Sequence, residues 1–123
     1  IVGTLKLLVN FPRPLAALGP QWVHVLGKPE FHHSFPSGHT AWVFLLLGSL
    51  WPGTPWPMRT ALLFFAVWVG WSRIAVGAHF PADVLGGACI GLTCAVVTSL
   101  LLWPWRSRIP FGMQQEKPSK QPK

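Results

Sequence analysis

The sequence contains few charged residues, and this scarcity narrows the class of protein. Only 11% of its 123 residues are charged, whereas a soluble domain carries about 25%. Half of the residues are hydrophobic, and there is no tyrosine beside eight tryptophans, an aromatic residue that collects at membrane interfaces. This composition argues against an ordinary soluble domain and favours a membrane protein or a very buried chain.

Acidic residues and cysteines are also scarce. Three acidic residues stand against ten basic ones, which gives a formal net charge of +7. Nucleic-acid binding is one interpretation of such a balance, but five of the ten basic residues follow the last apolar run, as in a cytoplasmic tail under the positive-inside rule. From the position of these basic residues we expect no nucleic-acid partner, a domain over residues 1–105 and a basic, disordered cytoplasmic tail over residues 106–123.

The two cysteines, Cys89 and Cys94, lie inside an apolar run and are expected to be small core residues.

Apolar runs alternate with breaks rich in proline, glycine and tryptophan, and this pattern predicts an all-α fold. We expect helices over residues 1–10 (the end of one), around 21–26 (a short piece), and over 40–51, 61–76 and 83–103. Pro104 is expected to close the last helix.

The length of these helices decides how they relate to a membrane. Only the last run reaches the roughly 20 apolar residues that a bilayer core requires. The runs over residues 40–51 and 61–76 are short enough to be helices of a soluble core, but they are long enough to cross a bilayer if their polar ends are counted. We expect an integral membrane bundle of about three transmembrane helices plus the end of a preceding one. Gly87 and Gly91 form a GxxxG step that permits close packing of the last helix.

A small polar loop precedes the first long apolar run, in the stretch FHHSFPSGHTAWVF. Ser37 and Gly38 lie at the start of the expected helix, where free backbone N–H groups bind anions. Three cations lie in or beside apolar helices, namely Lys6, Arg13 and Arg73. A charge in such a place is costly unless it is paired, so it is a candidate functional group. The pattern predicts a site for a phosphoryl group.

Two histidines and an aspartate complete the candidate site. Asp83 lies four residues after His79 and is expected to accept from one ring nitrogen, which leaves the other nitrogen unprotonated as a nucleophile. His39 is then the general acid for the leaving oxygen. Helices of alternating direction return all of these groups to one end. Phosphoryl transfer needs mainly positioning and charge neutralisation, so we expect catalysis without a metal.

Each residue also has a plainer explanation when it is taken alone. Lys6 fits a snorkelling lysine, the two arginines fit interface anchors, and His39 and Asp83 fit helix caps. These explanations do not account for the placement of all of these residues at one end of the molecule, or for their spacing along the sequence. His32 and His33 fit no role in the site, and because no carboxylate or cysteine cluster accompanies them, a loop near the membrane surface is favoured over a metal site.

The residues form three motifs: Lys6-x6-Arg13-Pro14, Pro36-Ser37-Gly38-His39 and Ser72-Arg73-x5-His79-x3-Asp83. In this order they resemble the full signature of the type 2 phosphatidic acid phosphatase (PAP2) superfamily, over residues 6 to about 100. The resemblance implies a membrane protein of six helices with its site at the extracytoplasmic face, of which this chain would hold the C-terminal part.

The resemblance also implies a role for each motif residue. His79 would form a phosphohistidine, oriented by Asp83, and His39 would protonate the leaving group, with no cofactor. The implied phosphate ligands are Lys6, Arg13, Ser37, Gly38 and Arg73.

We therefore expect a lipid phosphatase, in a bacterial inner membrane, whose substrate is a lipid phosphomonoester or diphosphate. Phosphatidate, phosphatidylglycerol phosphate, undecaprenyl diphosphate and lipid A phosphates all fit. A lipid phosphotransferase and a vanadium-dependent haloperoxidase, which shares the anion pocket but is soluble, are alternatives. A non-catalytic module that binds lipid phosphate is a further one, against which the intact His39, His79 and Asp83 argue.

Overall fold

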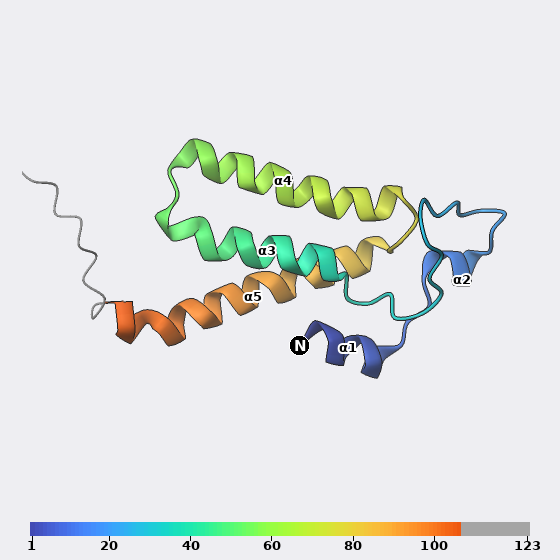
Figure 1. Ribbon diagram of the computed structural model, residues 1–123, viewed down its shortest axis with the longest axis horizontal. Helices are drawn as coiled ribbons and strands as arrows, with labels where there is room; N and C mark the ends of the chain where they lie inside the picture. Colours follow the sequence, from blue (N-terminus) through green and yellow to red (C-terminus); the bar gives the residue numbers. More distant parts are fainter. Residues whose placement is uncertain (107–123) are drawn as a thin grey trace, which may run out of the picture.

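The computed structural model describes residues 1–106, with side chains described as far as residue 104, and this part of the chain contains helices but no strand (Figure 1). The α-helices are α1 (Val2–Val9), α2 (Pro14–Leu18), α3 (Gly38–Leu50), α4 (Trp56–Ala75) and α5 (Pro81–Arg106), with a 3-10 turn, η1 (Trp51–Gly53), after α3. The all-α fold is therefore confirmed. Of the expected basic tail, only Arg106 belongs to the described residues.

Three expectations differ clearly from the structure, and each difference involves a proline. The short helix was expected around residues 21–26 but is α2, in which Pro14 occupies the first turn, where its missing N–H costs nothing. The helix α4 likewise begins within the proline-rich break, at Trp56. Pro104 does not close α5 but lies inside it, because its fixed φ is helical even though it cannot donate a hydrogen bond.

One described helix, α5, is long and apolar enough to cross a membrane, over Pro81–Pro104, with a mean hydropathy of 2.1. The helix α3 has 13 residues, or about 20 Å at 1.5 Å per residue, against a bilayer core of about 30 Å. The helix α4 has 20 residues but carries Arg59 and Arg73. Three transmembrane helices are thus not confirmed within the described residues.

The helices α3 and α5 pack along a seam of glycines. A Cβ atom at Gly87 would lie 2.5 Å from the carbonyl oxygen of Ser37, and one at Gly91 would lie 2.4 Å from that of Ala41. These neighbours are backbone atoms that cannot move aside, so the close approach depends on glycine. The predicted GxxxG step is therefore the face on which α5 contacts α3. It brings their first turns together, where the Ser37 N–H donates to the Asp83 carbonyl at 2.9 Å.

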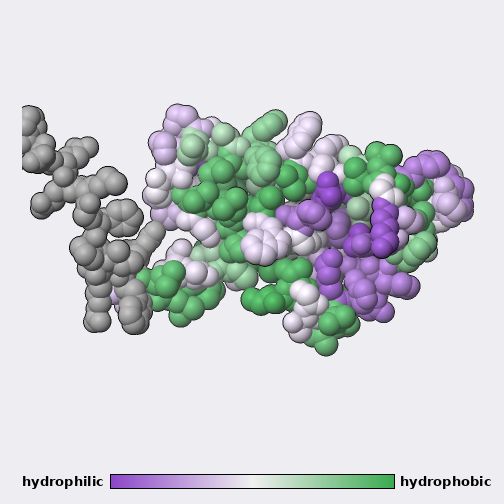
Figure 2. All heavy atoms as spheres, viewed as in Figure 1, coloured by the Kyte–Doolittle hydropathy of each residue, from purple (hydrophilic) through white to green (hydrophobic). Residues whose placement is uncertain are grey.

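Two regions result from this arrangement (Figure 1). The loop end comprises α1, α2, residues 10–37 and 76–80, and the adjoining ends of α3, α4 and α5. The helical stem is the rest of α3, α4 and α5, and many of its large apolar side chains are exposed (Figure 2). Cys89 is exposed on α5 and Cys94 is half-buried, and both are free thiols, so the expectation of two core cysteines was wrong for Cys89.

Candidate active site

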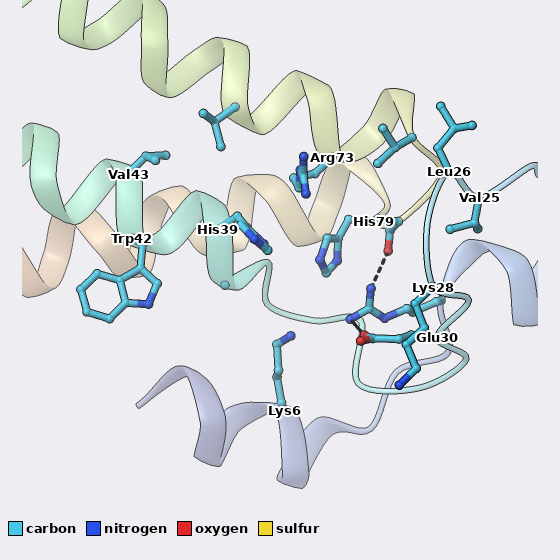
Figure 3. A pocket seen from close by; sticks show the side chains of 16 residues that line it. Lys6, Val25, Leu26, Lys28, Glu30, His39, Trp42, Val43, Arg73 and His79 are labelled. Carbon is cyan, nitrogen blue, oxygen red and sulfur yellow. Dashed lines mark hydrogen bonds and ion pairs between the residues drawn. The ribbon is translucent and has the colours of Figure 1, made fainter.

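One cavity of about 780 Å³ at the loop end collects most of the residues expected to act on phosphate. Six of the eight line it: Lys6, Arg13, Gly38, His39, Arg73 and His79. The side chains of Lys6, His39, Arg73 and His79 reach the same space from α1, α3, α4 and the α4–α5 loop (Figure 3). The other two, Ser37 and Asp83, do not line the cavity and are buried.

Arg13 joins three loop segments through its guanidinium group. Its Nε donates to the carbonyl of His32 at 3.2 Å, and its Nη1 donates to the carbonyl of Ala78 at 3.3 Å. Its Nη2 pairs with Glu30 at 2.5 Å, and Figure 3 marks this ion pair with a dashed line at Glu30. An arginine with this many partners is held rigidly, which suits a fixed cation facing an anion.

Asp83 carries out two tasks with one carboxylate oxygen. Its Oδ2 accepts from the Phe80 N–H at 2.8 Å, a bond that caps the first turn of α5. The same oxygen lies 3.5 Å from Nδ1 of His79. The helix-cap explanation and the orienting role are therefore compatible. Because Nδ1 faces Asp83, the other ring nitrogen, Nε2, is the one left for the cavity.

His79 is buried, and its environment favours the neutral ring. Burial and then the nearby charge of Arg13 lower the pKa of His79 from 6.5 to about 4, with a further lowering by Lys6 and an opposing contribution from Asp83. A charged group loses hydration on burial, which disfavours the imidazolium form. At neutral pH the ring therefore has one unprotonated nitrogen, as a nucleophile requires.

The first turn of α3 supplies the remaining wall. Ser37 is the N-cap residue and is fully buried, and its hydroxyl accepts a bond from Thr40 at 3.0 Å. Gly38 and His39 follow it and line the cavity. Trp42, one turn further along α3, also lines the cavity and is 73% exposed, so it belongs to the cavity mouth rather than to the core.

Three residues at the loop end were not anticipated from the sequence. Lys28 and Glu30 line the cavity, and Ser34 is fully buried and hydrogen-bonded to Asp83. Glu30 had a signal that was overlooked, because it is one of only three acidic residues in the chain. Ser34 had a weaker one, since it is a second small polar residue three positions before Ser37.

His32 and His33 support the site instead of lining it. The carbonyl of His32 accepts from Arg13, and Nδ1 of His33 donates to the carbonyl of Lys6 at 2.9 Å. Within the described residues, no three His, Cys, Asp or Glu side chains come together as a possible metal site. His32 and His33 therefore act as loop residues that hold the segments bearing the cations.

Comparison with known proteins agrees with the motif resemblance. A profile of the PAP2 superfamily matches residues 1–107. The chain is 37% identical over 107 residues to lipid A 1-phosphatase of Rhizobium johnstonii, covering 77% of this chain and 42% of that protein. It is 33% identical over 86 residues to phosphatidylglycerophosphatase B of Escherichia coli, covering 67% and 34%. It thus spans well under half the length of these two relatives.

A solved structure also matches. The crystal structure of Aquifex aeolicus LpxE superposes with a TM-score of 0.72 at 39% identity, covering 79% of this chain and 57% of that one. The match extends the likeness from sequence to the arrangement of the helices.

Proposed function

Because the chain belongs to the PAP2 superfamily, we propose that it is a membrane lipid phosphatase that hydrolyses a lipid phosphomonoester or diphosphate through a phosphohistidine. The observation that carries the proposal is the cavity at the loop end, where Lys6, Arg13 and Arg73 line one space together with two histidines. Lipid phosphatases among the matched relatives support the substrate class.

The cavity suits a molecule that is anionic at one end and apolar at the other. Its polar part includes Lys6, Arg13 and Arg73, whereas Val43 and Val69 continue the lining between α3 and α4. A phosphate among fixed cations with an apolar chain leaving between two helices is the geometry that a lipid phosphate requires.

In the first proposed step, the lone pair on Nε2 of His79 attacks phosphorus. An N–P bond forms, the P–O bond to the lipid breaks, and the leaving oxygen takes a proton from protonated His39. The proton on Nδ1 stays on the ring, so the phosphorylated imidazole carries positive charge. Asp83, 3.5 Å from Nδ1, is the nearest carboxylate to stabilise that charge.

In the second step, water attacks phosphorus from the side that the lipid oxygen left. Neutral His39 takes a proton from the water, the N–P bond breaks, and the electron pair returns to Nε2. The sum is lipid phosphate plus water giving lipid alcohol plus inorganic phosphate, with both histidines restored. Throughout, the three cations and the Gly38 N–H neutralise the phosphoryl oxygens, and in this proposal the Ser37 hydroxyl turns toward the phosphate when the site is filled.

The test is phosphate release by the purified protein from a panel of phosphatidate, phosphatidylglycerol phosphate, lipid A phosphates and undecaprenyl diphosphate. We expect release from at least one lipid, undiminished by a chelator, because side chains supply the positive charge. Vanadate should inhibit, since it forms a five-coordinate oxyanion like the transferring phosphoryl group. Loss of activity in chelator that Mg²⁺ restores would contradict the metal-free mechanism. Transfer of phosphate to an added lipid alcohol, without release, would identify a phosphotransferase.

We also propose that the loop end faces away from the cytoplasm of a bacterial inner membrane and that the basic residues after α5 lie on the cytoplasmic side. The support is the positive-inside rule applied to the tail. A Ser119→Cys variant, made with Cys89 and Cys94 replaced by serine, should react with an impermeant thiol reagent only after lysis. Reaction in intact cells would reverse the orientation.

A further inference from the structure

Ser34 occupies a position in the site that none of the three sequence motifs includes. It is fully buried, and its backbone N–H donates to the Phe11 carbonyl at 3.0 Å, two residues before Arg13. Its hydroxyl oxygen lies within 3.5 Å of Nδ1 of His79 and donates to Oδ2 of Asp83. A buried hydroxyl that contacts both His79 and the carboxylate of Asp83 can hold these two groups in position, in addition to filling space.

The direction of these bonds can be assigned because a serine has one proton. The proton of Ser34 lies on Asp83, the shorter of its two contacts. Toward His79 the hydroxyl therefore offers only lone pairs, so the contact requires a proton on Nδ1. Ser34 and Asp83 both lie 3.5 Å from that nitrogen and share its proton. Both acceptors select the same tautomer, with Nε2 free.

The contacts of Asp83 show what the hydroxyl does for the carboxylate. Oδ2 of this buried group accepts from Ser34 and from the Phe80 N–H. The Phe80 bond fixes the carboxylate to the α5 backbone, and the Ser34 bond holds it from the opposite segment. Without Ser34, the carboxylate loses a donor in a site from which water is excluded, where each bond matters more.

We propose that Ser34 is a positioning residue for phosphoryl transfer, which holds Asp83 toward His79 and shares the Nδ1 proton with it. This inference rests on the proposed function and adds a third member to the His79–Asp83 pair. Its effect should grow during the reaction, because the ring gains positive charge as the N–P bond forms and Nδ1 becomes a stronger donor. Hydrogen bonds at an empty site are often long and shorten in the transition state.

The first measurement compares Ser34→Ala with Ser99→Ala, a serine of α5 that lies at the far end of the stem. A hydrogen bond to a charged group predicts a loss of about 10- to 100-fold in kcat for Ser34→Ala. KM and product inhibition by inorganic phosphate, which report ground-state binding, should change less than about threefold, because Ser34 does not line the cavity. Ser99→Ala should match the wild type. An unchanged kcat, or an equal loss in the binding of inorganic phosphate, would overturn the proposal.

A double-mutant cycle with Asp83→Asn distinguishes a shared role from a merely structural one. If Ser34 acts through Asp83, the double variant should be no worse than about threefold below the poorer single variant. Multiplying losses would show independent roles and sink the idea. If Ser34→Ala does not fold, as judged by a lost helical circular dichroism signal, Ser34→Cys keeps a side chain of similar size and a weaker donor, and the same comparison applies.

A readout without turnover separates this inference from the proposed function. The ¹⁵N resonances of His79, assigned by their loss in His79→Gln, report which ring nitrogen carries the proton. The wild type should show the Nδ1–H tautomer, and Ser34→Ala should show a mixture. If the wild type releases no phosphate from any lipid, the proposed function fails while this measurement still decides the hydrogen-bond assignment. An identical tautomer in both proteins would refute the role of Ser34.

Discussion

Most of the buried side chains at the loop end are polar, whereas those of the helical stem are apolar. The stem also exposes many large apolar side chains (Figure 2). Ser34, Ser37 and Thr40 are 0% exposed, while Phe64 on α4 is 70% exposed and Leu101 on α5 is 69% exposed. Soluble proteins show the reverse distribution. The difference teaches that the two regions face different surroundings: the stem suits lipid or another apolar partner, and the loop end excludes water from a hydrogen-bonded polar group.

The energetics of the two regions differ accordingly. Every buried side-chain N or O atom in the described part of the chain has a hydrogen-bond partner, so removing one partner at the loop end leaves another group unsatisfied, at about 1–3 kcal/mol. Removing an exposed apolar group from the stem leaves no such group behind. Substitutions at the loop end should therefore affect function strongly, and those in the stem weakly, unless they disturb the glycine seam.

The largest difference is expected between His79→Ala and Leu101→Ala. Loss of the nucleophile should lower phosphate release by at least about 10⁴-fold and abolish the acid-labile phosphoenzyme trapped with labelled substrate. Leu101→Ala, an exposed stem position, should keep activity within about twofold. Phosphate release and phosphoenzyme trapping measure both. Similar losses in the two variants would remove the functional contrast between the regions.

The next effect depends on the leaving group. In His39→Ala, release from a lipid should fall by about 10²- to 10⁴-fold, because an alkoxide needs a proton to leave. Release from a nitrophenyl phosphate should fall far less, because nitrophenolate leaves without one. Steady-state rates on the two substrates test this. Equal losses would mean that His39 mainly binds phosphate.

The glycine seam links the two regions, and Gly91→Ala tests the link. The added Cβ would meet backbone atoms of α3 at 2.4 and 2.8 Å, so α3 and α5 must separate, at about 1–3 kcal/mol. We expect a lower midpoint of thermal unfolding and a loss of activity of about tenfold, because the seam sets the contact between Ser37 and Asp83. Gly53→Ala is the matched control, since a Cβ there has nothing within 4 Å. Equal behaviour of the two variants would contradict the account.

A smaller effect is expected from Glu30→Gln at the cavity. Glu30 is 57% exposed and pairs with Arg13, so it competes with phosphate for the guanidinium group. Exposed ion pairs contribute about 0.2–1 kcal/mol, so KM and the inhibition constant of vanadate should fall by about two- to fivefold. Glu116→Gln, the same charge change in the tail, should have no effect. A rise in KM would show instead that Glu30 holds Arg13 in place.

The smallest effect concerns pH. A pKa of about 4 for His79 keeps the nucleophile unprotonated as pH falls from 8 to 5, and half of the activity due to His79 should be lost at pH about 4. The measurement is kcat/KM, which reports the free enzyme, corrected for the ionisation of the substrate's own phosphate near pH 6. Since Asp83 raises the pKa of His79, Asp83→Asn should move the acid limb lower. An acid limb at pH 6.5 that belongs to His79 would contradict the lowering of its pKa by burial.

Much of the fold and of the site could be predicted from the sequence, because those parts depend on local spacing. The helices α3, α4 and α5 follow from apolar runs between breaks, and their alternating directions return the motif residues to one end. The GxxxG step also follows, since Gly87 and Gly91 lie on one face of a helix by periodicity alone.

Tertiary structure decided what depends on contacts between distant segments. The place of Ser34 rests on a bond from its backbone N–H to Phe11, and the pairing of Arg13 with Glu30 rests on how the loop between them folds back. No spacing rule sets these contacts, because residues 19–37 have no periodic pattern and are held by individual hydrogen bonds. The sequence by itself therefore determined which candidate groups meet at one end of the molecule, and the tertiary structure decided which neighbours hold them.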